Sequence, residues 1–289
     1  MTTAVPQKML AWQKHLPSKT PIRVEVDVPT PKRDEILVKI RAAGVCHSDY
    51  GLKEMETLPA EFAQARSKFT YGHEGCGQVV SIGPEVKQFK PGDSVSMICV
   101  PGCGSVSCHE CSAGVPQICQ KGPRYGGGQD GFFAPFAVVR ERAAIKLPKG
   151  VSAAAGAVAT DARMTAYHAV VNRAAVKTDD TVLIIGLGGL GFNALQVVLS
   201  IGARPVVVDQ RQSILDEARV IGVKSEDIVP VDADITDWFL QKNLQVDKVV
   251  DFVAVQATFE AAINSVRPAG TVVVAAMQVL NLMWQHAFI

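Results

Sequence analysis

The sequence feature that most constrains the fold is a glycine cluster at residues 186–191, which reads Gly-Leu-Gly-Gly-Leu-Gly. An apolar run rich in β-branched residues, 181–185, precedes it, and an apolar, helix-forming run, 190–201, follows it. Asp209 comes directly after the next apolar run, 205–208. A strand, a glycine turn and a helix in this order, followed by an acidic residue, predict a βαβ unit that binds a dinucleotide.

Each glycine of this cluster has an expected role. Gly186 allows the tight turn, Gly188 lets the backbone approach a pyrophosphate, and Gly191 lets helix and strand pack closely. Free N–H groups and a partial positive charge at the start of the helix favour phosphate binding. The candidate cofactor-binding residues in the turn are Gly186, Leu187, Gly188, Gly189, Leu190 and Gly191.

The residues after the second apolar run bear on the choice of cofactor. The carboxylate of Asp209 is suited to accept hydrogen bonds from ribose hydroxyls and to repel a 2′-phosphate, so we expect NAD rather than NADP. Arg211 works in the opposite direction, because a nearby arginine tolerates the extra phosphate.

The two halves of the chain have different patterns. Before about residue 150, short strands are expected at 35–45, 77–82, 94–99 and 136–144. Afterwards, an Ala-rich helical stretch at 152–175 leads into strands that alternate with helices, which predicts an α/β fold with a doubly wound parallel sheet. The uncharged run 181–203 fits this alternation better than a membrane span. The further elements expected in the second half are a helix at 213–221 and strands at 228–231, 248–252 and 271–275.

The seven cysteines all lie in the first half of the chain. An odd, clustered set is a poor disulfide framework, so metal binding in a reducing compartment is the better interpretation, with a cytoplasmic location expected. Four thiols close in sequence favour a closed structural zinc site over four reduced loop cysteines. They are Cys103, Cys108, Cys111 and Cys119, with Cys99 as an alternative to Cys103.

Cys46 and His73 are suitable zinc ligands but lie far apart in sequence. On spacing alone, a buried cysteine and a hydrogen-bonded histidine are the more frequent outcome. The formal net charge of +1 has no long run of one sign, and therefore does not indicate a nucleic-acid or anionic membrane partner.

Taken together, these motifs resemble the zinc-dependent medium-chain alcohol dehydrogenases. The resemblance runs from about residue 22 to about residue 276, and rests on residues 44–49 and 72–77, the cysteine loop and the glycine cluster. It implies a GroES-like zinc-binding catalytic domain, 1–150, followed by a Rossmann NAD-binding domain, 151–289. It also implies a small alcohol or carbonyl substrate and a homo-oligomer.

The resemblance assigns roles to particular residues. Cys46, His73 and Asp161 would hold a catalytic zinc ion, with Glu74 beside it as an alternating ligand. Asp49 would orient His73, and Ser48 would accept the hydroxyl proton while hydride passes to NAD. His47 and Thr165 match positions that line the cofactor.

The sequence departs from the family pattern at the cysteine loop and at its C-terminal end, and Gly51 stands where some members have a relay histidine. Four residues separate Cys103 from Cys108, where two are usual, so Cys103 must reach over from a longer loop. The family also continues past residue 274, whereas 277–289 are not recognised as family sequence, so the last Rossmann strand is expected to be missing. This favours, as an alternative, an inactive NAD-binding or partner-binding relative. A zinc-free quinone-reductase-like member is disfavoured, because Cys46, His73 and the cysteine loop are present.

Overall fold

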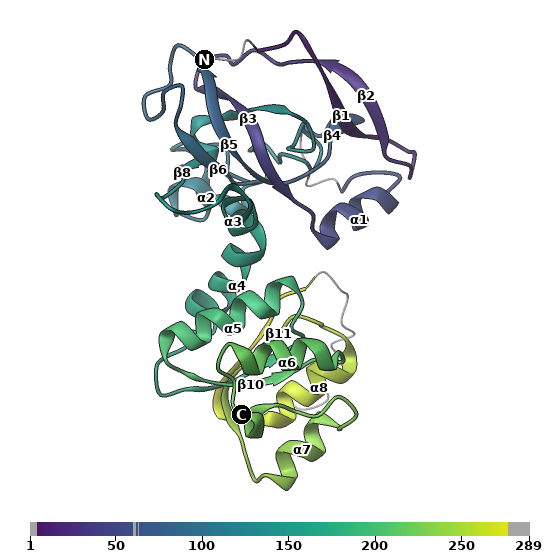
Figure 1. The fold of residues 1–289 in the computed structure, drawn as a ribbon, viewed down its shortest axis with the longest axis vertical. Coiled ribbons are helices and arrows are strands. Elements are labelled where there is room, and N and C mark those ends of the chain that lie inside the picture. The colour runs from purple at the N-terminus through teal and green to yellow at the C-terminus, as the bar shows by residue number, and fades with distance from the viewer. Residues whose placement is uncertain (1–4, 60–61, 63, 277–289) are drawn as a thin grey trace. The chain divides into compact units, whose positions relative to one another are not determined.

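The computed structural model describes residues 5–59, 62 and 64–276. Its chain forms two compact units, Met1–Asp161 and Ala162–Ile289 (Figure 1). The family-derived boundary near residue 150 stays a prediction.

The first unit is built around a five-stranded antiparallel sheet with the strand order β7-β3-β5-β6-β8. Its inward side chains, among them Ile36, Val38, Val79 and Met97, are fully or almost fully buried and form one apolar core. The expected strands at 35–45, 77–82 and 94–99 are confirmed as β3, β5 and β6. The bounds are β3 (Glu35–Gly44), β5 (Glu74–Ile82), β6 (Ser94–Met97), β7 (Phe136–Arg140) and β8 (Ala144–Lys146).

The strand predicted at 136–144 is interrupted, and this part of the prediction was wrong. A 3-10 turn, η2 (Glu141–Ala143), separates β7 from β8. The carboxylate of Glu141 accepts hydrogen bonds from the backbone N–H groups of Lys87 and Gln88, both at 3.0 Å. This interaction holds the chain at the turn, so that β7 pairs with β3 while β8 pairs with β6.

A second, three-stranded sheet in this unit has the order β2-β1-β4 and was not predicted. Its strand β1 pairs antiparallel with both neighbours. Beside it, Leu52 of the first helix packs in a small apolar cluster with Phe69 and Tyr71. The bounds are β1 (Lys8–His15), β2 (Ile22–Asp27), α1 (His47–Glu54), β4 (Lys68–Thr70), α2 (His109–Ser112) and η1 (Pro116–Ile118).

The Ala-rich stretch forms consecutive helical segments, as expected. Ser152 begins the first of them, since its side chain accepts a hydrogen bond from the N–H of Ala155. These segments are α3 (Ala153–Val158), the π-helical turn η3 (Ala159–Arg163), α4 (Met164–Tyr167) and the π-helical turn η4 (His168–Arg173).

The second unit contains the predicted parallel sheet, with the strand order β10-β9-β11-β12. Strand β9 has buried side chains on both faces, as its unbroken apolar sequence predicts. Val182 and Ile184 belong to one core cluster, and Leu183 and Ile185 belong to the other. The strands are β9 (Thr181–Ile185), β10 (Arg204–Val208), β11 (Val246–Asp251) and β12 (Val266–Val274).

Helices cover both faces of this sheet (Figure 1). Leu195 of α5 and Leu215 of α6 pack against the Ile184 face, whereas Trp238 of α7 and Ala262 of α8 pack against the Leu183 face. The doubly wound prediction is therefore confirmed. The bounds are α5 (Gly189–Ile201), α6 (Gln212–Val220), η5 (Ser225–Asp227), α7 (Ile235–Gln241) and α8 (Gln256–Ser265).

The strand predicted at 228–231 is reduced to one bridge, between Ile228 and Val207. Val229 donates a single ladder hydrogen bond, 3.0 Å long, to the carbonyl of Val207. Pro230 then follows and has no N–H group, so the ladder cannot continue. The expectations about residues 277–289 lie outside the described residues.

Candidate metal and dinucleotide sites

Four side chains from three distant parts of the first unit converge on one point. They offer one thiol, one imidazole nitrogen and two carboxylate oxygens, all within 4.8 Å of one another. Zinc bonds of about 2.0–2.3 Å to such ligands require separations of this size, so the set fits a zinc ion. The residues are Cys46, His73, Glu74 and Asp161, the four named from the family resemblance.

The position of each candidate ligand follows from its element. Cys46 is the residue before α1, so its thiol stands at the start of that helix. His73 directly precedes β5, Glu74 begins it, and Asp161 lies in the π-helical turn η3. The imidazole Nε2 of His73 lies 3.2 Å from Oδ2 of Asp161. That nitrogen therefore faces the cluster and is the one available to a metal.

Asp49 fixes the other side of this arrangement. Its Oδ1 lies 3.1 Å from Nδ1 of His73, and its Oδ2 accepts the backbone N–H of Cys46 at 3.0 Å. One buried carboxylate thus holds two ligand residues at once. Such a carboxylate–histidine contact fixes the ring orientation and is typical of histidines that bind metal.

Burial and charge perturb the acid–base behaviour of the cluster. Burial would lower the pKa of His73, but its hydrogen bonds with Asp161 and Asp49 raise it well above the usual value. Burial, together with the charge of Asp161, raises the pKa of Glu74 to about 7. A dense group of carboxylates around one imidazole is an environment that a divalent cation would neutralise.

The cysteine loop forms a second cluster, with its four sulfur atoms within 4.8 Å of one another. The Cys103 and Cys111 sulfurs are 3.8 Å apart, and those of Cys108 and Cys119 are 3.7 Å apart. Four thiols at this spacing match a closed tetrahedral zinc site. The thiol of Cys99 instead donates to the carbonyl of Tyr125, so the geometry favours Cys103 as the first ligand.

The electrostatics of this loop also suit a cation. Burial would raise the pKa of Cys119, but backbone hydrogen bonds from Cys103 and Lys121 lower it to about 6. Arg140 stabilises the loop from β7, where its guanidinium donates to the carbonyl of Cys103 at 2.9 Å and pairs with Asp34. The role of Arg140 was not predicted, since a contact across 37 residues leaves no local pattern in the sequence.

The glycine turn of the second unit has the expected local geometry. Gly186 has a φ of 85°, a conformation that favours glycine. A Cβ at Gly191 would overlap the carbonyl oxygen of Gly186, whereas a Cβ at Gly188 would meet nothing within 4 Å. Helix α5 therefore packs tightly against the turn while its first residues face open space, as a phosphate-binding turn requires.

Asp209 follows β10 and lies beside this turn. Its Oδ2 accepts the backbone N–H of Leu187 at 2.8 Å. The guanidinium of Arg211 pairs with both carboxylate oxygens, at 2.9 and 3.0 Å. Burial would raise the pKa of Asp209, but the hydrogen bonds from Arg211 and Leu187 lower it.

The remaining predicted residues lie on helices. His47 and Ser48 are exposed in the first turn of α1, where the Ser48 hydroxyl is 3.6 Å from the Cys46 sulfur. Thr165 is half-buried in α4 of the second unit.

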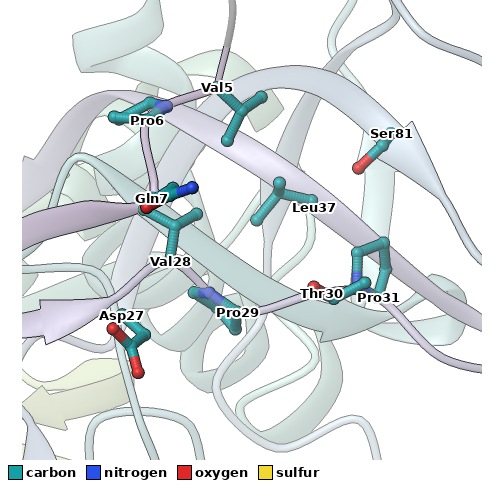
Figure 2. A pocket seen from close by; sticks show the side chains of 10 residues that line it. All are labelled: Val5, Pro6, Gln7, Asp27, Val28, Pro29, Thr30, Pro31, Leu37 and Ser81. Atoms are coloured by element: carbon teal, nitrogen blue, oxygen red, sulfur yellow. The ribbon is translucent and has the colours of Figure 1, made fainter.

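A hollow of about 500 Å³ lies elsewhere in the first unit, beside the start of β1 and the end of β2 (Figure 2). None of the predicted site residues lines it, and Asp27 is its one charged lining side chain. The lining residues are Val5, Pro6, Gln7, Asp27, Val28, Pro29, Thr30, Pro31, Leu37 and Ser81.

Across residues 5–59, 62 and 64–276, no helix has both the length and the apolar character needed to span a membrane.

Comparison with protein families gives two matches. Residues 32–149 match the alcohol dehydrogenase GroES-like domain, and residues 189–284 match the zinc-binding dehydrogenase domain. The second match extends past residue 277, so the expectation that 277–289 lack family sequence was wrong for 277–284. L-threonine 3-dehydrogenase of Pyrococcus horikoshii is 34% identical over 275 residues, which are 92% of this chain and 75% of that protein. Alcohol dehydrogenase B of Mycobacterium tuberculosis is 32% identical over 203 residues, which are 63% of this chain and 52% of that protein. The match to alcohol dehydrogenase B thus spans about half of that relative's length.

Solved structures agree with the sequence relatives. Acetophenone reductase from Geotrichum candidum in complex with NAD superimposes with a TM-score of 0.82 and 31% identity, covering 97% of this chain and 79% of that one. A zinc-binding dehydrogenase from Sinorhizobium meliloti bound to NADP gives 0.84 and 25%, covering 98% and 80%. With the thiol–imidazole–carboxylate cluster, the cysteine cluster and the glycine turn all in place, the chain belongs to the zinc-dependent medium-chain alcohol dehydrogenase family.

Proposed function

We propose that this protein is an oxidoreductase that transfers hydride between NAD(H) and an alcohol or the corresponding aldehyde or ketone. The observation that carries the proposal is the cluster of Cys46, His73, Glu74 and Asp161, whose ligand atoms lie within 4.8 Å of one another. Zinc held there supplies a Lewis acid that lowers the pKa of an alcohol hydroxyl and polarises a carbonyl. A zinc-free quinone-reductase-like activity would not require this set of metal ligands.

The side chains of the cluster have separate tasks in this proposal. Cys46, His73 and Asp161 hold the metal, and the buried carboxylate of Glu74 is positioned to take the place of a ligand. Asp49 holds the imidazole of His73 with Nε2 facing the cluster. The Ser48 hydroxyl, exposed next to Cys46, receives the proton of the substrate hydroxyl and passes it to solvent.

The second unit would hold the cofactor, which would supply its nicotinamide as the hydride acceptor. The open backbone at Gly188 and Gly189 receives the pyrophosphate, and Asp209 and Arg211 face the adenosine ribose. Thr165 of this unit is proposed, from the family resemblance, to line the cofactor. The cysteine cluster would hold a structural zinc ion, which ties together the loop that carries its four cysteines.

Metal analysis combined with turnover tests this proposal. The purified protein is expected to contain two zinc ions per chain and to reduce NAD with alcohols or oxidise NADH with carbonyls. Acetophenone and L-threonine belong in the substrate panel, since relatives with those substrates in their names match this chain. Folded protein that contains two zinc ions and binds NADH, yet turns over no member of a broad alcohol and carbonyl panel, would support the inactive, cofactor-binding alternative.

Two further features belong to the proposal. A homo-oligomer is expected for the family, and light scattering of the purified protein will establish its mass. A cytoplasmic location is proposed because cysteines clustered for metal binding are typical of a reducing compartment, and fractionation of the producing cells tests it.

A further inference from the structure

Lys14, in β1, is a fully buried lysine whose ammonium group has three acceptors. Its exposed fraction is 0%, and Nζ donates to the backbone carbonyls of Ser18 at 2.7 Å, Lys53 at 2.7 Å and Met55 at 2.6 Å. An ammonium group has three N–H donors, so these hydrogen bonds use all of them. A charge removed from water is tolerated only when hydrogen bonds replace its hydration. The three carbonyls therefore hold this side chain in one position.

Two of these three acceptors belong to the end of α1. Lys53 lies in the last turn of this helix, and Met55 is the residue directly after it. The last carbonyls of a helix lack partners within the helix and carry a partial negative charge, which a cation stabilises. The ammonium group of Lys14 thus joins the end of α1 to β1, across 39 and 41 residues of the chain.

The beginning of the same helix carries part of the metal cluster. Cys46 is the residue before α1, and Asp49 lies in its first turn. The carboxylate of Asp49 accepts the backbone N–H of Cys46 and contacts the imidazole of His73. A helix of eight residues is only about 12 Å long and moves as a unit, so a displacement of its end also displaces its beginning.

Strand β1 also fixes the segment that leads to His73. It pairs antiparallel with β4, and directly after β4 the backbone N–H of Tyr71 donates to the carbonyl of Trp12 at 2.9 Å. His73 follows two residues later. One strand therefore holds this segment through its backbone and holds α1 through the side chain of Lys14. The separation between Cys46 and His73 depends on both connections.

We infer that Lys14 is a positioning residue for the metal cluster: by joining the end of α1 to β1, its buried ammonium group sets the separation between the candidate ligands Cys46 and His73. The inference rests on the proposed zinc-dependent function, and it gives a role in metal binding to a residue outside the four candidate ligands. The packing of Leu52 against Phe69 is a second link between α1 and β4. Loss of the ammonium group therefore weakens zinc binding without abolishing it.

Substitution of Lys14 by methionine tests this, because it keeps most of the side-chain length and removes the ammonium group. The zinc affinity of the Cys46–His73 cluster is expected to fall by about tenfold, the lower end of the effect of losing a partner behind a metal ligand. The affinity of the cysteine cluster is expected to stay within twofold of wild type. Competition with a chromogenic chelator measures both affinities.

A second variant, Lys14→Gln, carries the test if Lys14→Met does not fold. Its amide still donates hydrogen bonds, but it has two N–H donors on a shorter side chain and cannot satisfy three carbonyls. Its zinc affinity at the Cys46–His73 cluster is expected to lie between those of the wild-type protein and Lys14→Met. Circular dichroism verifies that each variant is folded.

Phe89→Leu is the matched control for a general loss of stability. Phe89 is 7% exposed, packs in the apolar core of the five-stranded sheet, and lies between β5 and β6, far in sequence from the four candidate ligands. This substitution is expected to lower Tm, as Lys14→Met does, but to leave the zinc affinities of both clusters within twofold of wild type.

The outcomes separate this inference from the function on which it rests. If wild-type protein binds no zinc at Cys46, His73 and Asp161, the proposed function fails and the inference fails with it. If wild-type protein binds zinc there, and the folded Lys14 variants bind it within twofold of wild type, the inference alone is overturned. An equal fall at both clusters, or a fall of the same size in Phe89→Leu, also overturns it, because the loss would then reflect stability.

Discussion

Substitution of Asp49 by asparagine removes one negative charge beside the cluster of Cys46, His73, Glu74 and Asp161 while keeping the shape of the side chain. The carboxylate accepts two hydrogen bonds, from the backbone N–H of Cys46 at 3.0 Å and from Nδ1 of His73 at 3.1 Å. An amide has a single oxygen to replace both carboxylate oxygens, and its NH2 group donates rather than accepts. One of the two ligand residues therefore loses its partner.

The expected magnitude follows from burial and charge. Asp49 is only 8% exposed, so solvent screens its interactions weakly. A hydrogen bond to a charged group contributes about 1.5–3 kcal/mol, which corresponds to about 10- to 150-fold in an equilibrium constant. Loss of a carboxylate behind a metal-binding histidine typically weakens metal affinity by about 10–100-fold. We therefore expect the zinc affinity of this cluster to fall by about 10–100-fold, and turnover at limiting zinc to fall with it.

Competition with a chromogenic chelator measures this affinity, and the cysteine cluster of the same chain serves as an internal reference that should not change. The control variant is Asp130→Asn. Asp130 likewise accepts a backbone N–H, that of Thr70 at 2.8 Å, but its side chain pairs with Arg66, whereas that of Asp49 holds two cluster residues. A zinc affinity within twofold of wild type in Asp49→Asn would refute the reasoning.

Further predictions concern the second cluster, the glycine turn and pH. Cys119→Ser is expected to lower the zinc content from two ions per chain to one and to reduce Tm, whereas Cys99→Ser keeps both ions. Atomic absorption measures the zinc content, and two ions in Cys119→Ser would contradict the assignment. Gly188→Ala is expected to weaken NADH binding by at least about tenfold with an unchanged Tm, because its methyl group enters open space needed by the pyrophosphate. Gly191→Ala is expected to lower Tm as well, because its methyl group overlaps the Gly186 carbonyl. Equal losses of Tm in the two variants would count against this geometry. Burial lowers the pKa of His73, but its hydrogen bonds with Asp161 and Asp49 raise it by a larger amount. The protonated imidazole therefore stabilises the folded, metal-free protein. This contribution is full below about pH 6.5 and is lost as pH rises through the raised pKa. Because zinc binds the neutral ring, the zinc-induced increase in Tm should grow between pH 6 and pH 8, and a scanning calorimetry series in which it shrinks would oppose this reading.

The sequence predicted those elements whose pattern is local. The run 181–185 is apolar from Val182 onward, and the following glycines leave few alternatives to a strand, a turn and a helix, which the structure confirms as β9 and α5. The run 35–45 likewise became β3.

The elements that were missed depend on contacts between distant residues. Strand β1 reads Lys-Met-Leu-Ala-Trp-Gln-Lys-His, which lacks a clear alternation, and its pairing with β2 and β4 determines its state. Lys14 illustrates the reason, since it is fully buried and donates to the carbonyls of Ser18, Lys53 and Met55. A lysine at a buried strand position looks like a surface residue to any pattern based on polarity.

The two candidate metal sites show the same difference between local sequence patterns and contacts between distant residues. The spacing of Cys46 and His73 alone favoured separate structural roles, and only the family resemblance brought Asp161, 88 residues after His73, into the set. The cysteine loop, by contrast, was recognisable from four thiols close in sequence, including the longer spacing after Cys103. Local spacing identifies a site that a single loop forms, whereas a site assembled by the fold requires the fold itself.

Anomalous X-ray diffraction at the zinc edge from crystals of the zinc-loaded protein tests the central claim most directly, with the cysteine cluster as a built-in reference. The account predicts two peaks per chain, one of them within about 2.0–2.3 Å of the Cys46 sulfur, Nε2 of His73 and a carboxylate oxygen of Asp161. A peak at the four cysteines without one at Cys46, His73 and Asp161 would contradict it.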